Sequence, residues 1–222
     1  MKLLDLYCGV GLASWGYWQS GRFSEIVGVD SENEHRRSYS FDFIHADALS
    51  LDYEFLSQFD FIHASPPCQA YSKATPREKR HHHERLIQRT HVVLHAIGKP
   101  YVVENVEGSG ASLKPSVRLR GVDVGLPHDR PRYFHISTWP GANLRKFHVA
   151  NLRMSSAANF KVRPVHDGKH KTKSELVELF GLQEINQRSL ARMSIDAISQ
   201  GIPPAMTKAI ACAIIPEPVW IN

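Results

Sequence analysis

The sequence lacks any long hydrophobic run, which excludes a membrane-spanning helix of the usual kind. No stretch approaches the roughly 18 consecutive apolar residues that such a helix needs, and Asp5 interrupts the apolar start before a signal-peptide core develops. Cysteine is scarce: Cys8, Cys68 and Cys212 are odd in number and far apart, which is typical of reduced thiols rather than of a disulfide framework. We therefore expect a cytoplasmic protein in which one thiol is reactive.

The sequence also lacks the patterns of a repeat protein and of a metal site. No internal repeat or low-complexity segment is present. His81, His82 and His83, with His91 and His95 beyond them, have no cysteine or carboxylate at zinc spacing, and HExxH is absent. We expect no metal and interpret these histidines as a polar helix face, or as partly protonated groups near phosphate.

The composition is that of one globular domain with at most a small appendage. The chain has 222 residues, of which 42% are hydrophobic and 22% charged, so it can bury a sizeable core. The net charge of +5 is concentrated in two basic stretches, Lys73–Arg89 and Gly141–Lys173. Two such stretches favour binding of a phosphate backbone. The alternative is a solvated helix face and a solvated loop.

Strand patterns alternate with helical patterns over the first hundred residues. The strands are expected at 2–7, 25–30, 44–48, 59–64, 100–103 and 133–137, and the helices at 12–19, 31–40, 80–97, 173–180 and 205–215. This order predicts an open, mostly parallel α/β sheet with helices on both faces and ligands at the carboxyl ends of the strands. We assign 1–137 plus 172–222 to one catalytic domain. The basic, weakly periodic segment 138–171 is expected to be an insertion on one rim.

A glycine-containing turn follows the first predicted strand. Gly9 and Gly11 come directly after Asp5-Leu6-Tyr7, where the absence of a Cβ lets the backbone approach a ligand. The third glycine of the dinucleotide fingerprint is missing, so NAD is not favoured, but Asp30 ends the next strand where it can hold two ribose hydroxyls. An ordinary turn is the alternative.

A cysteine follows the fourth predicted strand on a proline-stiffened loop, Pro66-Pro67-Cys68-Gln69. Such a cysteine beside a basic stretch is where a nucleophilic thiolate is expected, although a small buried hydrophobe is the alternative. Glu104 ends the next strand and therefore points into the same crevice. Arg130 and Arg132 add two cations whose i, i+2 spacing places both on one side of an extended segment.

The order of these motifs resembles that of the cytosine-C5 DNA methyltransferase family, which uses S-adenosylmethionine. Residues 5–11 resemble its DxFxGxG loop, 67–69 its PCQ motif, 104–106 its ENV motif and 127–132 its P-Q-x-R-x-R motif, and 201–204 with 210–211 resemble its closing helix motif. The resemblance leaves 138–171 unmatched. It implies a Rossmann-like methyltransferase sheet with a short basic target-recognition insertion.

The resemblance also implies the roles of the reacting residues. Cys68 would add to C6 of a cytosine flipped out of duplex DNA, and a methyl group would pass from S-adenosylmethionine to C5. Glu104 would bind N3 and the exocyclic amine, while Arg130 and Arg132 would hold the base carbonyl and the thiolate. The C5 proton must then leave to a base before Cys68 is eliminated.

The same resemblance implies the binding residues. In the cofactor site, Tyr7 would pack near the adenine, Asp30 would bind ribose and Asp47 would contact the adenine amine; the full expected set is Asp5, Leu6, Tyr7, Gly9, Gly11, Asp30, Asp47 and Pro67. The residues expected to bind nucleic acid are Gln69, Ser72, Lys73, Arg145, Lys146, Arg153, Lys161 and Arg163. Double-stranded DNA is the expected partner of a monomer with no membrane contact, in a bacterial or phage-infected cell.

The sequence departs from the family pattern at a few positions. Leu12 replaces a glycine, His128 stands where glutamine is common, and Ser199-Gln200 replaces Gly-Asn. The short insertion indicates slight sequence discrimination or a very short site. Three alternatives stay open: a tRNA cytosine-C5 methyltransferase with the same chemistry, an inactive nucleic-acid-binding homologue, and transfer of a group larger than methyl.

Overall fold

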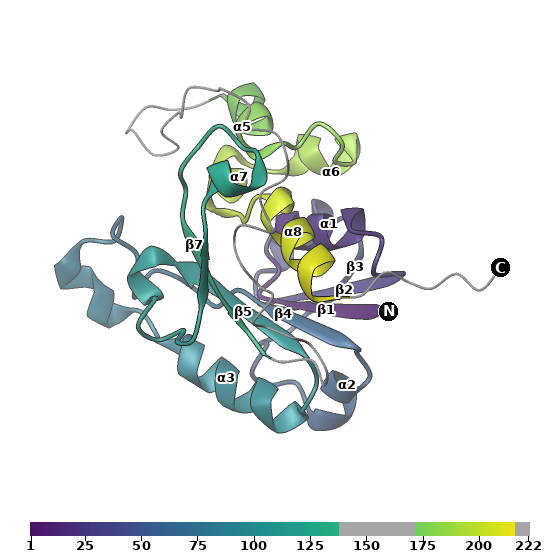
Figure 1. Cartoon of the computed structure of the whole chain (residues 1–222), viewed down its shortest axis with the longest axis vertical. Coiled ribbons are helices and arrows are strands. Elements are labelled where there is room, and N and C mark those ends of the chain that lie inside the picture. The colour runs from purple at the N-terminus through teal and green to yellow at the C-terminus, as the bar shows by residue number, and fades with distance from the viewer. Residues whose placement is uncertain (138–171, 216–222) are drawn as a thin grey trace.

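The computed structural model describes residues 1–137 and 172–215, which form a seven-stranded sheet in the order β3-β2-β1-β4-β5-β7-β6 (Figure 1). The strands are β1 (Lys2–Leu6), β2 (Glu25–Asp30), β3 (Asp42–His45), β4 (Phe61–Ala64), β5 (Tyr101–Val106), β6 (Val117–Leu119) and β7 (Arg132–Ile136). The first five strands in this sheet order, β3, β2, β1, β4 and β5, run parallel to one another, while β7 is antiparallel to both β5 and β6. The predicted mostly parallel α/β sheet is therefore confirmed.

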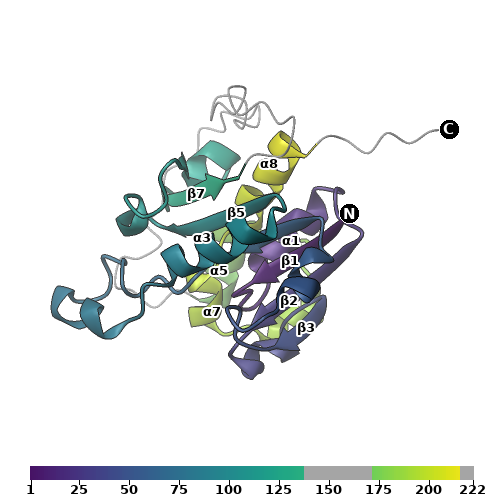
Figure 2. The same cartoon turned by 90° about the horizontal axis from the view of Figure 1, so that it is seen from below.

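Helices cover both faces of the sheet, as predicted (Figures 1 and 2). One face carries α1 (Leu12–Gln19) and α8 (Pro204–Ile214), and the other carries α2 (Tyr53–Ser57) and α3 (Leu86–Ile97). The shorter helices α5 (Lys173–Phe180), α6 (Gln187–Arg192) and α7 (Ile195–Gln200) contribute to a third apolar cluster, which includes Val10 and Leu12. Val10 belongs to the turn after β1 and Leu12 begins α1, so the third cluster fixes this turn from outside the sheet.

The two faces of the sheet have separate cores because successive strand side chains point to opposite sides. Leu3 packs in the cluster that contains Tyr17 and Met206, whereas the next residue, Leu4, packs in the cluster that contains Ile87. Each fully buried leucine contributes about 1.5–3 kcal/mol. This burial holds the strand ends, and the turns that follow them, in fixed positions.

Helices α1 and α8 cross at unusually close range. A Cβ on Gly16 would lie 2.0 Å from the carbonyl oxygen of Pro204, so only glycine fits at this position. Thr207 on α8 donates a hydrogen bond of 2.8 Å to the carbonyl of Ala13. The crossing therefore fixes the first turn of α1, which begins directly after the glycine-containing turn.

Several elements differ from the sequence predictions. The polar helix expected up to Ser40 is a 3₁₀ helix at Asn33–Arg37 with no buried residue, so no apolar face extends it. Strand β3 ends at His45, rather than near residue 48, because its neighbour β2 ends at Asp30 in the paired register. The helix expected from residue 80 begins at Leu86, and residues 77–82 form a separate 3₁₀ helix without buried side chains.

Six short elements of the described residues were not predicted: α2, β6, α6, α7 and the 3₁₀ helices Glu107–Ser109 and Gly121–Val124. Each has six residues or fewer, too few for a periodic pattern to be distinguished from a loop. Within the described ranges, no helix combines the length and the apolar character that crossing a membrane requires. The predicted insertion at 138–171 lies outside the described residues.

Candidate active site

A cavity of about 230 Å³ opens at the carboxyl ends of β1, β2, β4 and β5. Parallel strands bring the residues that follow them to one edge, as the fold prediction required. Of the predicted site residues, the cavity is lined by Asp5, Tyr7, Gly9, Asp30, Pro67, Cys68, Gln69, Glu104 and Arg132. Segments that are far apart in the sequence therefore meet at one site.

The turn after β1 is held by the carboxylate of Asp30. The backbone N–H of Gly9 donates to Oδ2 of Asp30 at 2.8 Å, and that of Glu32 donates to Oδ1 at 2.9 Å. Tyr7 and Gly9 both have positive φ, 58° and 51°, which brings the turn back toward the end of β2. A Cβ on Gly9 would meet no described atom within 4 Å, so it would project into open space at the cavity.

Asp5 is completely buried beside this turn. Its Oδ2 accepts a hydrogen bond of 2.5 Å from Ser14, whose hydroxyl also contacts that of Tyr39 at 2.5 Å. Its Oδ1 has no hydrogen-bond partner among the described residues. Burial raises the pKa of Asp5 to about 7, and the charge of Asp30 adds to this rise. A cationic ligand group in the cavity would favour the ionised form.

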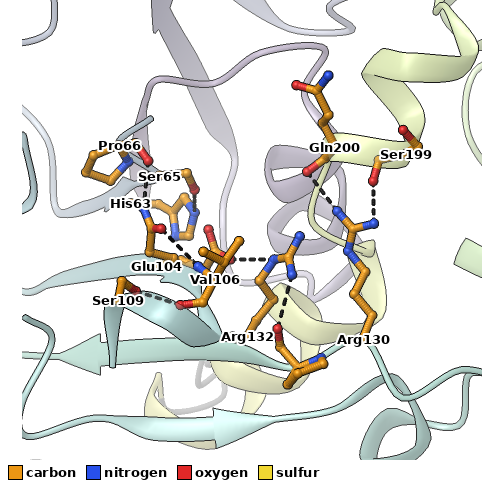
Figure 3. A network of polar contacts seen from close by, with 12 residues as sticks. His63, Ser65, Pro66, Glu104, Val106, Ser109, Arg130, Arg132, Ser199 and Gln200 are labelled. Carbon is orange, nitrogen blue, oxygen red and sulfur yellow. Dashed lines mark hydrogen bonds and ion pairs between the residues drawn. The ribbon is translucent and has the colours of Figure 1, made fainter. Parts of the chain in front are cut away.

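The loop that carries Cys68 is fixed by backbone and amide contacts. Nδ2 of Asn105 donates to the Pro66 carbonyl at 2.7 Å, linking β5 to the loop after β4 (Figure 3). The N–H groups of Tyr71 and Ser72 both donate to the Cys68 carbonyl, at 2.9 and 2.8 Å. The half-buried Cys68 side chain lines the cavity. Asn105 thus acts on the position of Cys68 through the backbone.

The surroundings of Cys68 favour a thiol. Burial raises the pKa of Cys68, and the negative charge of Glu104 adds to the rise, while Arg132 and Arg130 oppose it. The sequence predicted a thiolate from the basic stretch nearby. The difference arises because burial and the charge of Glu104 act directly on the thiol, whereas five of the six lysines and arginines of that stretch are exposed.

Glu104 and Arg132 form a buried ion pair. Arg132 lies opposite Val106 in the β5–β7 register, and Glu104 is two residues before Val106, so all three share one face of the sheet. Nε of Arg132 is 2.9 Å from Oε1 of Glu104, and the two residues are 7% and 4% exposed (Figure 3). The direction of the N–H does not make this contact a hydrogen bond, so Oε1 still has no hydrogen-bond partner in the described part of the chain.

Opposing effects act on the carboxyl of Glu104. Burial raises its pKa, whereas the positive charges of Arg132 and Arg130 and a hydrogen bond with Ser65 lower it, and burial is the largest of these effects. An acid with a raised pKa and an unsatisfied oxygen is suited to exchange a proton, or a hydrogen bond, with a ligand in the cavity.

Arg130 is held in a different way from Arg132. Its guanidinium donates to the carbonyl of Ser199 and, at 3.0 Å, to that of Gln200, and lies 5.1 Å from the ring centre of Phe180 (Figure 3). These contacts connect the segment before β7 to the end of α7. Arg130 lies outside the cavity lining, so the structure does not place both guanidinium groups at the ligand.

Three predicted cofactor residues also lie outside the cavity lining. Leu6 is buried in the core cluster, and Asp47 is exposed and accepts a hydrogen bond of 2.9 Å from the Leu49 N–H. Gly11 has a φ of 85°, and a Cβ there would lie 2.7 Å from the Tyr39 ring. Its glycine is therefore explained by packing.

The predicted nucleic-acid contacts are exposed, half-buried in the case of Ser72, or outside the described residues. Gln69 lines the cavity mouth, and Ser72 accepts a hydrogen bond of 3.1 Å from the Ala74 N–H. Lys73, whose side chain is 77% exposed, forms an ion pair of 2.6 Å with Glu107. Arg145, Lys146, Arg153, Lys161 and Arg163 lie outside the described residues.

Sequence reasoning missed two polar residues behind Glu104. His63 is completely buried in β4, where its ring contacts the hydroxyl groups of Tyr17 and Ser65. Ser65 also lines the cavity. The available signal was a histidine within the apolar run Phe61-Ile62-His63-Ala64, because a buried polar side chain needs partners.

The fold is that of a methyltransferase. The structure matches the methyltransferase EhMeth of Entamoeba histolytica with a TM-score of 0.60 and 11% identity, over 95% of this chain and 96% of that one. The sequence model of the C-5 cytosine-specific DNA methylase family matches residues 1–114, just over half of the 222 residues. The chain therefore belongs to the C-5 cytosine-specific DNA methylase family.

Two further solved structures are similar over part of their length. A prophage-encoded DNA modification methyltransferase of E. coli has 20% identity and a TM-score of 0.49, covering 61% of this chain and 46% of its own. A mutant DNMT2 of Spodoptera frugiperda has 20% identity and a TM-score of 0.43, covering 73% of this chain and 54% of its own. The chain thus aligns with about half the length of these two proteins. No curated protein sequence matches it.

Proposed function

We propose that the protein is an S-adenosylmethionine-dependent DNA methyltransferase that modifies C5 of cytosine. The observation that carries this proposal is the shared cavity: Cys68 and Glu104 line one part of it, and Asp5, Gly9 and Asp30 line another. The reaction requires a nucleophile, an acid and a binding site for the cofactor, and the cavity brings candidates for all three together.

The residues present fit the cofactor. S-adenosylmethionine carries a cationic ammonium and a cationic sulfonium, and it supplies the methyl group as an electrophile. The unsatisfied Oδ1 of Asp5 suits a cation, and the open space at Gly9 suits close approach to the backbone. The fixed Asp30 carboxylate would accept hydrogen bonds from the ribose hydroxyls, with Tyr7 and Pro67 against the adenine.

The geometry supports distinct roles in the reaction for Cys68 and Glu104. The Cys68 thiol would lose its proton to water, and its sulfur would bond to C6 of cytosine as the electron pair of the 5,6 double bond moves toward C5. Glu104 would give a proton or a hydrogen bond to N3, which stabilises the negative charge that develops on the ring. After C5 gains the methyl group, water would accept the C5 proton, the electron pair of that C–H bond would re-form the 5,6 double bond, and the C–S bond would break to release the Cys68 thiolate. Arg132 would hold Glu104 in place throughout.

Double-stranded DNA is the substrate that we propose, with the target base flipped into the cavity. The family description supports DNA. The exposed cations of Lys73–Arg89, the segment that follows the Cys68 loop in the sequence, support a phosphate-bearing partner. Recognition by residues 138–171 stays a prediction, because that segment lies outside the described residues.

A methyl-transfer assay tests the proposal. Purified protein would be incubated with S-adenosylmethionine labelled in the methyl group, with duplex DNA in one arm and transfer RNA in another, followed by mass spectrometry of the nucleosides. We expect 5-methylcytosine in DNA, lost by at least about 10³-fold in Cys68→Ala and unchanged in Cys212→Ala, which removes an exposed thiol on α8. Product in RNA alone, or full activity of Cys68→Ala, would contradict the proposal.

A further inference from the structure

Three buried or half-buried polar side chains form a hydrogen-bonded chain that runs from the core toward Glu104. The Tyr17 hydroxyl on α1 lies 3.0 Å from Nδ1 of His63 on β4, and Nε2 of His63 lies 2.8 Å from Oγ of Ser65. Ser65 in turn lines the cavity together with Glu104 and, as a hydrogen-bonding neighbour, lowers the pKa of the Glu104 carboxyl. Figure 3 shows these residues with the contact between His63 and Ser65 dashed.

The chain has a preferred direction. Burial lowers the pKa of His63 to about 3, so its ring is neutral at physiological pH and carries one N–H. Among the described residues, His63 is the one hydrogen-bond partner of the Tyr17 hydroxyl. If Nδ1 carried the proton, the Tyr17 O–H would be buried without an acceptor, at a cost of about 1–3 kcal/mol.

The arrangement that satisfies every donor runs from the core toward the cavity. The Tyr17 O–H donates to Nδ1 of His63, and the Nε2–H donates to Oγ of Ser65. The Ser65 hydroxyl proton is then left to donate to Glu104. A donor aimed at a carboxyl oxygen favours the ionised acid and fixes its orientation.

We propose that Tyr17, His63 and Ser65 are positioning residues that orient the Glu104 carboxyl and stabilise its ionised form through this chain. The inference deepens the proposed function and rests on it for its catalytic meaning, because it makes Glu104 readier to release a proton to the ring of the target base. Ion pairing alone does not orient the acid, since the contact between Arg132 and Oε1 is not aligned as a hydrogen bond. The other ionisable groups that act on Glu104 or on its chain are Arg130, Arg132, Cys68 and Asp5.

The tautomer of His63 is the first test, and it needs no activity. Ring ¹⁵N chemical shifts of the labelled protein distinguish a protonated Nε2 from a protonated Nδ1. We expect the Nε2–H tautomer in the wild type. An Nδ1–H tautomer would reverse the direction of the chain and overturn the proposal.

The pKa of Glu104 is the second test. Carboxyl ¹³C shifts would be followed against pH, with the Glu104 signal assigned by its loss in Glu104→Gln. We expect Ser65→Ala to raise this pKa by about one unit and Tyr17→Phe to raise it by less, because it acts two hydrogen bonds away. His63→Leu should behave like Ser65→Ala, and His63→Gln should return toward the wild type because an amide both accepts and donates.

Methyl transfer links the chain to catalysis. The pKa of Glu104 in the pH profile of kcat should move in the same direction in Ser65→Ala, while His95→Gln, an exposed change on α3, should leave the profile unchanged. A wild type without methyl transfer would refute the proposed function, yet the two NMR tests would still decide the chain. Unchanged Glu104 titration in Ser65→Ala, which needs no large repacking, would overturn the inference even if His63→Leu fails to fold.

Discussion

The two parts of the cavity hold their acids by different means. At the ends of β1 and β2, Asp30 accepts two backbone N–H groups, and Asp5 accepts one buried hydroxyl. At the end of β5, Glu104 faces the guanidinium of Arg132 at 2.9 Å. Backbone donors are fixed by the fold and suit a group that binds, whereas a side-chain cation tunes an acid that must change its hydrogen bonding during a reaction.

Replacing Glu104 by glutamine should produce the largest effect. Glutamine keeps the shape but has no acidic proton for N3, so we expect kcat to fall about 10³-fold with the cofactor Kd nearly unchanged. Steady-state methyl transfer and equilibrium cofactor binding measure the two quantities. Glu25→Gln, the same change at an exposed site at the start of β2, is the control and should be neutral. If Glu104→Gln weakened only cofactor binding, Glu104 would act as Asp5 and Asp30 are proposed to act, and the two parts of the cavity would not differ in role.

Removing the positive charge of Arg132 should lower the free energy of unfolding, because it acts on the buried acid at the end of β5. Arg132→Met leaves Glu104 buried without its ion-pair partner, which costs about 3–5 kcal/mol of unfolding free energy. Arg118→Met, which removes an exposed arginine 3.6 Å from Glu107, should cost less than about 1 kcal/mol. Urea denaturation measures the unfolding free energy of both variants. Equal losses in Arg132→Met and Arg118→Met would show that burial does not strengthen the ion pair between Arg132 and Glu104.

Asp5, at the end of β1, should make the free energy of unfolding depend on pH. The folded protein holds this proton up to a pKa of about 7, against 3.8 for the unperturbed group, so its contribution to stability is lost as the pH rises from about 4 to about 7. In Asp5→Asn this loss disappears. We expect the cofactor-free variant to gain about 4 kcal/mol relative to the wild type between pH 4 and pH 8.

Denaturation at a series of pH values measures that difference. His63, whose pKa is lowered to about 3, acts in the opposite direction below pH 6.5, but it is present in both proteins and cancels in the comparison. A difference between the two proteins that stays constant with pH would show that Asp5 is ionised in the folded state throughout.

The smallest expected effect is that of Asp30→Asn. An amide oxygen can accept from the N–H of Gly9 or of Glu32 but holds the turn with a weaker, uncharged hydrogen bond. We expect a roughly tenfold weaker cofactor Kd with kcat at saturating cofactor within about twofold of the wild type. Isothermal titration and saturation kinetics separate these outcomes. A large fall in kcat would place Asp30 in the reaction itself.

The sequence was sufficient to predict the sheet and the meeting of Asp5, Asp30, Cys68 and Glu104, because the ends of parallel strands determine where such residues lie. It was insufficient to predict the hydrogen-bond partners of Arg130. The i, i+2 spacing with Arg132 carries no information about the carbonyl groups of Ser199 and Gln200, 69 and 70 residues later in the chain. The lowered acidity of the Cys68 thiol also depends on burial by distant segments.

The chain behind Glu104 was missed for a related reason. Its members come from α1, β4 and the loop after β4, and their contacts exist only after the sheet has formed. A histidine in an apolar strand indicates a buried partner without naming it. Hydrogen bonds between side chains from different elements therefore cannot be assigned from the sequence and have to be read from the structure.

The most direct measurement is covalent trapping on duplex DNA containing 5-fluorocytosine, with S-adenosylmethionine present. Because fluorine cannot leave C5 as a proton does, the bond between the enzyme sulfur and C6 cannot break after methyl transfer. We predict a stable protein–DNA adduct whose peptide mass places the linkage on Cys68, and no adduct with Cys68→Ala. An adduct on another residue, or methylation of ordinary cytosine without any adduct at Cys68, would contradict the account.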